Sequence, residues 1–340
     1  MATSEQIKAL LRSYAESDEA RFFAVAMQIA AHEARIGHGA LAKELRAIID
    51  EAKSLHKGPL VFKKATPIFQ PHGELSNLLT ASFPKIRLSD MVLSSSVSAI
   101  LKRIIKEQRK IVKLRSHGLS PRRKFLLLGS PGTGKTMTAS ALAGELSLPL
   151  LVIRLDGVIT KYMGETSAKL RLIFEALRKN RGIYLFDEFD SIGSTRILTN
   201  DVGEMRRILN SFLQLMDEDE SESLIFSATN HPDILDQALY RRFDDVIEYD
   251  LPTKEARIEL LKNRLSSQQN AELAFEELAD TSSGLSHAEL TRACDDVIKD
   301  MIINDRSKFT SKEVLQMIKE RKRIHEKGND STKDNAETSK

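Results

Sequence analysis

The chain has 340 residues, of which 41% are hydrophobic and 29% charged, a composition typical of a well-cored globular protein with two or three domains. Its formal net charge is only +3, so the overall charge does not require a nucleic-acid partner. The single cysteine, Cys294, excludes an internal disulfide and a cysteine-rich zinc site, and the lack of a signal peptide or an apolar run near ~18 residues predicts a cytoplasmic protein without a membrane span.

Residues 1–56 are predicted to form an N-terminal helical domain that binds a partner or a target. Apolar residues recur at helical spacing in three stretches, at 7–14, 22–29 and 41–52. His32 and Glu33 begin a zinc-protease H-E-x-x-H pattern, but Ile36 stands where the second histidine belongs. The chain contains no complete zinc-protease motif.

Residues 57–87 hold several prolines without clear periodicity and are predicted to form a linker or an extended crossing segment. Residues 102–124 carry ten Lys and Arg residues against one acid, Glu107. Because the apolar positions of this segment recur at helical spacing, a solvated basic helix face is the simplest interpretation. A nucleic-acid-binding surface is the alternative, although the segment has no aromatic residue that could stack on a base.

Short apolar strands alternate with helices between residues 124 and 250. The predicted strands are 124–128, 150–155, 182–187, 223–228 and 246–250. This alternation predicts an α/β fold over residues 88–252, in which helices cover both faces of a parallel five-stranded sheet.

The remaining residues are predicted to be helical and then disordered. Residues 253–325 have the pattern of a small helical subdomain, and Ser286 and Thr310 each begin a capping box that opens a helix. Residues 326–340 are dominated by polar residues and are predicted to form a disordered tail.

Residues 129–136, Gly-Ser-Pro-Gly-Thr-Gly-Lys-Thr, fit the pattern G-x-x-x-x-G-K-[ST] without a mismatch and lie between a predicted strand and a predicted helix. In such a loop the glycines let backbone N–H groups close around a phosphate, and the helix adds its positive N-terminal end. A nucleoside triphosphate and Mg²⁺ are therefore the expected ligands, with Lys135 at the β- and γ-phosphates and the Thr136 hydroxyl on the metal; the family resemblance given below implies that the nucleotide is ATP. The expected nucleotide contacts are Gly129, Ser130, Pro131, Gly132, Thr133, Gly134, Lys135, Thr136 and Met137.

Two further strands end in candidate catalytic residues. Asp187 and Glu188 follow one apolar run, and Asn230 follows another. Because parallel sheets carry their sites at the carboxyl ends of strands, we expect these side chains beside the phosphate loop. Asp187 would hold Mg²⁺ through water, and Glu188 would take a proton from the attacking water. Asn230 would hydrogen-bond the γ-phosphate and that water.

Two adjacent arginines, Arg241 and Arg242, lie in the stretch 235–244, Leu-Asp-Gln-Ala-Leu-Tyr-Arg-Arg-Phe-Asp. Such arginines suggest fingers that reach the active site of the next subunit, where a guanidinium group stabilises charge developing on the γ-phosphate. The alternative is a surface ion pair with Asp244 or Asp245.

The order of these motifs resembles the AAA family of AAA+ ATPases over about residues 87–325. The resemblance implies a large α/β ATPase subdomain, a small helical lid and a ring, usually a hexamer. The arginine segment of the family typically reads L-D-x-A-L-x-R-P-G-R-F-D. Residues 235–244 lack the Pro-Gly spacer, which leaves open whether Arg241 or Arg242 contacts phosphate.

Two more matches resemble members of the family that remodel proteins. Lys161, Tyr162, Met163 and Gly164 resemble the first pore loop, whose aromatic residue grips a polypeptide. Residues 284–290 resemble the helix start beside the adenine, which implies that Gly284 and Ala288 contact the base.

The resemblance implies a ring-forming ATPase that remodels, unfolds or translocates a protein substrate through a central pore. Because the chain has no protease motif, any role in degradation would need a separately encoded protease. The alternative is an ATP-dependent nucleic-acid remodeller or loader, which the basic segment 102–124 favours and the Tyr162 loop disfavours.

Overall fold

The computed structural model describes residues 8, 19–35, 38–55, 71–159, 163–190, 202–232, 237–265 and 273–337. The chain divides into two compact units, Met1–Ile68 and Phe69–Lys340. Each unit is considered by itself below.

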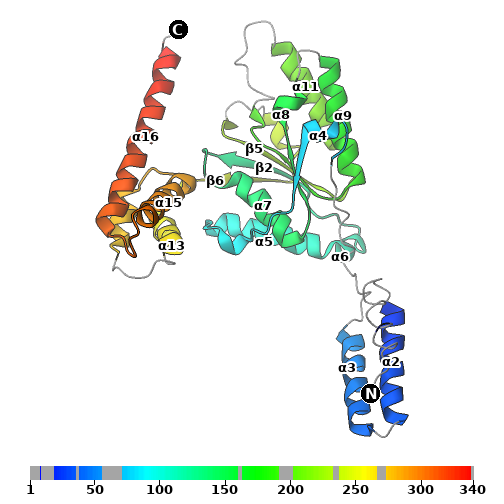
Figure 1. Ribbon diagram of the computed structural model, residues 1–340. Helices are drawn as coiled ribbons and strands as arrows, with labels where there is room; N and C mark the ends of the chain where they lie inside the picture. The colour runs from blue at the N-terminus through cyan, green and yellow to red at the C-terminus, as the bar shows by residue number, and fades with distance from the viewer. Residues whose placement is uncertain are drawn as a thin grey trace. The chain divides into compact units, whose positions relative to one another are not determined.

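The N-terminal unit contains a hairpin of two helices, α2 (Glu19–Arg35) and α3 (Gly39–Leu55), drawn in blue in Figure 1. At the turn between them, Nδ1 of His38 lies 2.6 Å from a carboxylate oxygen of the buried Glu33, and this hydrogen bond lowers the pKa of Glu33. The second and third predicted helices are thus confirmed, and the first, at 7–14, lies outside the described residues apart from Lys8.

The second unit is built on a six-stranded sheet with the strand order β1-β3-β4-β5-β2-β6. The five predicted strands are all confirmed, and neighbouring members pair in parallel. They are β2 (Lys124–Gly129), β3 (Leu150–Ile153), β4 (Ile183–Phe186), β5 (Leu224–Thr229) and β6 (Asp245–Tyr249).

A sixth strand, β1 (Leu79–Ser82), pairs antiparallel with β3 at the edge of the sheet. It lies within residues 57–87, so the expectation that this whole segment is a linker, and that the sheet has only five strands, is corrected. The apolar and polar residues of Leu-Thr-Ala-Ser alternate over only four positions, the shortest run from which a strand can be recognised. Its place in the sheet comes from pairing with β3.

Helices cover both faces of the sheet, as predicted (Figure 1). On one face α5 (Ser95–Arg109) and α7 (Lys135–Leu146) pack on Phe125 and Leu127 of β2, and on the other α9 (Met163–Lys179) and α11 (Val202–Asp217) belong to the cluster that contains Leu126 and Leu128. Alternate residues of a strand point to opposite faces, and both faces are buried here, so the strands are apolar throughout. Shorter helices of this unit are α4 (Leu75–Leu78), η1 (Leu88–Asp90), α6 (Ile111–Arg115), α8 (Leu155–Val158) and α12 (Gln237–Tyr240).

Four helices form the C-terminal part: α13 (Lys254–Leu265), α14 (Phe275–Thr281), α15 (His287–Ile303) and α16 (Ser311–Glu337). They have their own apolar core, which includes Cys294. Both predicted capping boxes are present, since Ser286 and Glu289 exchange hydrogen bonds at the start of α15, and Thr310 and Glu313 do so before α16.

The last helix, α16, continues to Glu337, through most of the segment that its composition predicts to be disordered. That segment has no proline and continues a helix whose beginning packs on α15, so the helical hydrogen bonds can propagate along it. Among the described residues, no helix is long and apolar enough to cross a membrane.

Candidate functional site

The predicted phosphate loop connects β2 to the first turn of α7. Gly129 has φ of +148°, and a Cβ atom there would lie 2.3 Å from the carbonyl oxygen of Tyr249. Gly132 has φ of +77°, and its Cβ would lie 2.6 Å from Oγ of Ser286. Only glycine accommodates these two positions, because a side chain would be both strained and obstructed.

Lys135 is the first residue of α7 and is only 7% exposed. Its Nζ atom donates to the carbonyl oxygens of Gly129 and Ser130, at 2.7 and 2.9 Å, and to Oδ1 of Asn230, at 2.7 Å. Burial lowers the pKa of Lys135, and the negative charge of Asp187 opposes this shift. All the N–H bonds of the ammonium group therefore have protein acceptors that a phosphate oxygen could replace.

Thr136 and Asp187 meet at the same edge of the sheet, where the Thr136 hydroxyl donates to Oδ2 of Asp187 at 2.6 Å. Hydroxyl and carboxylate oxygens are the ligands that Mg²⁺ prefers, and such sites usually complete the shell with substrate phosphates and water. Within the described residues, no group of three or more acidic, histidine or cysteine side chains could hold a metal alone. The pair therefore fits a metal ion that is shared with a nucleotide.

Glu188 follows Asp187 in a backbone conformation that side chains rarely adopt, with φ of +52°. Its N–H donates to Oδ1 of Asp187 at 3.0 Å, and the next N–H, of Phe189, donates to the carbonyl of Ala228 at 2.8 Å. These bonds hold the turn in place, although a left-handed non-glycine residue costs roughly 1–3 kcal/mol. The Glu188 side chain is exposed at the end of β4.

The structure thus brings together the predicted residues from three strand ends: Lys135 and Thr136 after β2, Asp187 and Glu188 after β4, and Asn230 after β5. Asp190 accepts a hydrogen bond at 2.9 Å from the hydroxyl of Thr229, the last residue of β5, which links the two strand ends.

A cavity of about 520 Å³ lies next to this group. Asp90, Met91 and Val92 line it from one side, Thr133 and Met137 from the phosphate loop and α7, and Leu260, Arg264, His287 and Thr291 from the C-terminal helices. Gly284 and Ala288 are not among the lining residues. Instead, the N–H of Ala288 donates to the carbonyl of Gly132 at 3.0 Å, so α15 begins directly on the phosphate loop.

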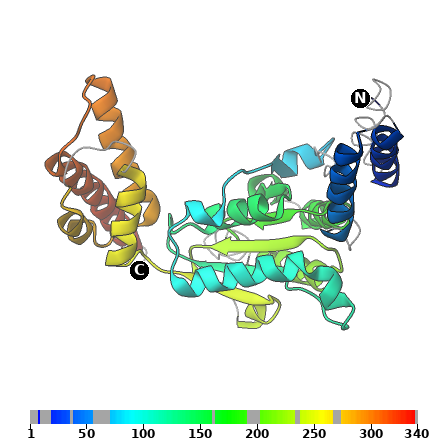
Figure 2. The same cartoon turned by 90° about the horizontal axis from the view of Figure 1, so that it is seen from below.

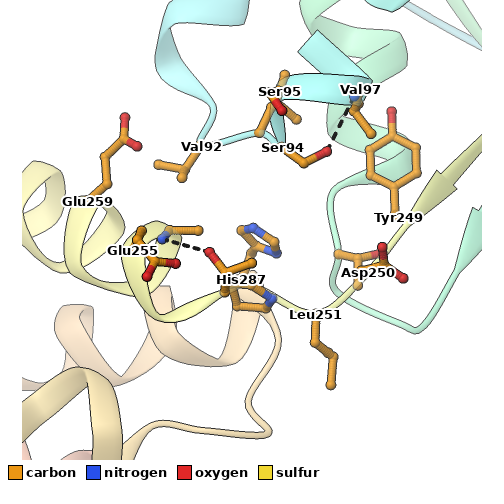
Figure 3. Close-up of a pocket in the computed structure, with 15 residues that line it drawn as sticks. Val92, Ser94, Ser95, Val97, Tyr249, Asp250, Leu251, Glu255, Glu259 and His287 are labelled. Carbon is orange, nitrogen blue, oxygen red and sulfur yellow. Dashed lines mark hydrogen bonds between the residues drawn. The ribbon is translucent and has the colours of Figure 1, made fainter.

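A second cavity, of about 350 Å³, shares Val92, Thr133 and His287 with the first (Figure 3). The His287 ring points into it in Figure 3, between Tyr249 and Asp250 on one side and Glu255 on the other. Burial lowers the pKa of His287, and its buried Nδ1 has no hydrogen-bond partner in the part of the chain that the structure describes. The imidazole is therefore neutral near pH 7 and has a free nitrogen.

Sequence reasoning missed the contributions of residues 90–92, of α13 and of His287 to these cavities. No motif marks residues 90–92. The C-terminal helices reach the cavity only through tertiary packing, which local sequence patterns do not reveal. The only signal was the helix start at 284–290, which contains His287; that Gly284 and Ala288 contact the base stays a prediction.

The two predicted finger arginines lie exposed in the turn between α12 and β6. Arg242 forms an ion pair with Asp217, the last residue of α11. No side-chain partner is found for Arg241 among the described residues. Neither arginine pairs with Asp244 or Asp245, the partners that the alternative interpretation named. Asp245 instead forms ion pairs with Arg103 of α5 and with Arg122, which lies just before β2.

The predicted pore loop is only partly described. Lys161 and Tyr162 lie outside the described residues, and Met163 and Gly164 form the first positions of α9. Its role therefore stays a prediction.

Comparison with known proteins finds one family model, the ATPase family associated with various cellular activities (AAA), which matches residues 125–251. The chain is 34% identical over 329 residues to the uncharacterized AAA family ATPase y4kL of Sinorhizobium fredii, covering 95% of this chain and 96% of that protein. It is 36% identical over 209 residues to the proteasome-activating nucleotidase of Methanothermobacter thermautotrophicus, covering 59% of this chain and 51% of that protein. It is 39% identical over 184 residues to the cell division cycle protein 48 homolog of Archaeoglobus fulgidus, covering 52% of this chain and 25% of that protein.

Proposed function

The chain belongs to the AAA family of ATPases and binds and hydrolyses ATP. We propose that it works as a homo-hexameric ring that remodels, unfolds or translocates a protein substrate through a central pore. The observation that carries the proposal is the convergence of Lys135, Thr136, Asp187 and Asn230 within hydrogen-bond distance at one edge of the sheet. The protein substrate is supported by the Tyr162 loop and by similarity to a proteasome-activating nucleotidase.

Lys135 is proposed to bind the β- and γ-phosphates by exchanging partners. Its present acceptors are two backbone carbonyls and the Asn230 amide oxygen, all neutral groups. A phosphate oxygen carries negative charge, so it adds the attraction between opposite charges to the hydrogen bond that the ammonium group donates. The exchange also leaves the Asn230 amide free to contact the γ-phosphate and the attacking water.

Thr136 and Asp187 are proposed to hold Mg²⁺, which would neutralise part of the phosphate charge when bound. Glu188 is proposed as the general base. Its side chain is exposed at the end of β4, directly after Asp187, where an attacking water could reach it.

The base of ATP is proposed to occupy the 520 Å³ cavity, where Met91, Val92 and Leu260 offer apolar contacts and His287 offers a neutral nitrogen. In this arrangement Ala288 also places the start of α15 on the phosphate loop, through the hydrogen bond from its N–H to the carbonyl of Gly132.

Arg241 is proposed as the finger that reaches the γ-phosphate of the neighbouring subunit. Arg242 already has a charged partner in its own chain, Asp217, whereas Arg241 is exposed and has none among the described residues. Arg242 would then position the turn that carries Arg241.

The N-terminal helical domain, residues 1–56, is proposed to select the target, and the helical region that follows residue 253 to act as the lid. A role in degradation would require a separate protease as partner. Target selection by the N-terminal helices and the need for a protease are testable once a substrate is known.

ATP turnover with and without an unfolded polypeptide tests the proposal. We expect an unfolded protein to raise turnover and duplex DNA to leave it unchanged, with the Glu188→Gln variant as the background control. The competing function, a nucleic-acid remodeller, is favoured by the basic segment 102–124. Stimulation by DNA without stimulation by polypeptide would establish that function instead.

A further inference from the structure

The basic segment separates into two kinds of residue when its contacts are examined. Its five arginines all form ion pairs with carboxylates: Arg103 and Arg122 with Asp245, Arg109 with Glu145, Arg115 with Glu222 and Arg123 with Asp219. Four exposed lysines have no acidic partner among the described residues: Lys102, Lys106, Lys110 and Lys113. These four lysines are called the lysine row.

The lysine row follows α5 and α6 along the chain. Lys110 lies between the two helices, and its N–H bonds to the carbonyl of Lys106, while its own carbonyl accepts from Leu114. The backbone of Lys110 departs from helical values, with φ of −110° and ψ of 22°, so the helical run is interrupted there: Lys102, Lys106 and Lys110 follow one another at i, i+4 spacing up to the end of α5, and Lys113 lies on α6. Figure 2 shows α5 and α6 following one another along the underside of the sheet.

Keeping these lysines together has a cost to the folded chain. Like charges at i and i+4 destabilise a helix, and the nearby acids are already held by arginines. A surface that served solubility alone would gain from acids placed between the lysines. The row is therefore suited to a partner that supplies negative charge.

The choice of lysine favours phosphate over protein carboxylates as that charge. Protein interfaces are enriched in arginine and depleted in lysine, whereas lysine binds phosphate well as a point charge. Residues 95–124 also contain no Phe, Tyr or Trp on which an unpaired base could stack. This combination favours the backbone of a duplex over a single strand.

We propose that the lysine row is a docking surface for double-stranded DNA, which it binds through the phosphate backbone without reading sequence. The row lies outside the nucleotide site, so docking needs no ATP and does not depend on the protein-remodelling function. Such binding releases counterions, and log K falls with log salt with a slope of about −0.9 for each phosphate contact. Four contacts predict a slope of about −3.6.

The test is binding of a fluorescent duplex to the full chain, without nucleotide, between 50 and 200 mM salt. The triple variant Lys102→Ala, Lys106→Ala, Lys110→Ala should lower the slope to about −0.9 and weaken binding on the order of 10²-fold at 0.1 M salt. The matched control removes three exposed lysines of the C-terminal helical region for which the described residues likewise offer no acidic partner: Lys308→Ala, Lys312→Ala, Lys319→Ala. The control should retain the wild-type slope.

Several results would overturn the proposal. They are an absence of duplex binding by the wild type at 50 mM salt, an equal loss in both triple variants, and binding to vesicles of anionic lipid by a protein that does not bind DNA. Displacement of the duplex by poly-glutamate at equal charge concentration would also overturn it, because the surface would then accept carboxylates as readily as phosphates. Since the lysines are exposed and unpaired, both triple variants should unfold at the wild-type temperature.

Discussion

The assignment of Arg241 as the finger makes a prediction that separates it from its neighbour. An arginine that contacts the transferred phosphate from another subunit contributes about 10³–10⁵ in kcat. Arg241→Ala should therefore lose at least 10³-fold in ATP turnover in assembled protein. The site within the same chain is complete without Arg241, so ATP binding by the variant should remain close to that of the wild type.

The expected effect at Arg242 is far smaller, because its contact with Asp217 is an ion pair between partly exposed groups, with side-chain exposures of 47% and 39%. Exposed pairs of this kind contribute about 0.2–1 kcal/mol, which corresponds to no more than about fivefold in rate if all of it is lost. Arg242→Ala and Asp217→Asn should both lie within about tenfold of the wild-type kcat and should resemble each other.

Steady-state ATPase assays at saturating ATP, on samples of matched oligomeric state, measure these rates. Mixing Arg241→Ala with Glu188→Gln should restore part of the activity, because a ring that holds both variants contains interfaces with one intact base and one intact finger. The reasoning fails if Arg242→Ala loses 10³-fold while Arg241→Ala and Asp217→Asn stay near wild type. In that case Arg242 exchanges Asp217 for phosphate when the ring assembles.

Three further predictions concern single positions. Glu188→Gln should keep ATP bound but stop turnover, which a filter-binding assay beside a phosphate-release assay would show; normal turnover would remove its role as base. Tyr162→Ala should retain ATPase activity but lose remodelling of a folded reporter protein, and unchanged remodelling would remove the gripping role. Thr138→Val should lower the urea midpoint more than Tyr249→Phe. Both variants lose the 2.7 Å hydrogen bond between the two hydroxyls, but only Thr138→Val leaves the buried Tyr249 hydroxyl without an acceptor. The expected loss of unfolding free energy is therefore about 1–3 kcal/mol for Thr138→Val and about 1 kcal/mol for Tyr249→Phe. Equal midpoints would contradict that difference.

The parts of the fold that could be predicted are those encoded by local patterns. The phosphate loop at 129–136 is recognisable because glycine, lysine and threonine are needed at fixed spacing, and its neighbouring strands are apolar because both faces of the sheet are buried. The acid pair Asp187 and Glu188 follows from the same logic, since a buried strand that ends in two acids must place them at the sheet edge.

What could not be predicted depends on contacts between distant segments. Strand β1 is defined by its pairing with β3, and nothing in four residues indicates that partner. The pairing of Arg242 with Asp217 joins positions on separate elements, so the sequence left the two arginines equivalent. His287 lines both cavities because α15 begins on the phosphate loop, which the capping box at Ser286 indicates only as a helix start.

The connection from the sheet to the lid is anchored at both ends. On the sheet side, the Tyr249 hydroxyl lies 2.7 Å from that of Thr138 in α7, and burial raises the pKa of Tyr249. On the lid side, the buried guanidinium of Arg257 donates to the carbonyls of Pro252, at 2.6 Å, and Ala279, at 2.9 Å. A buried arginine that holds two backbone segments links the start of α13 to α14, because releasing either carbonyl would leave an N–H of a buried cation without an acceptor.

Between these anchors lie Asp250 and Leu251, both exposed. The phosphate loop also meets the C-terminal helical region directly, since the carbonyl of Gly132 accepts the N–H of Ala288 at 3.0 Å, and Val92 packs against the core of that region. If the helical region acts as the lid, as proposed above, a phosphate that draws in the backbone of this loop would act on the first turn of α15 through that hydrogen bond, a route that does not pass through the core of the sheet.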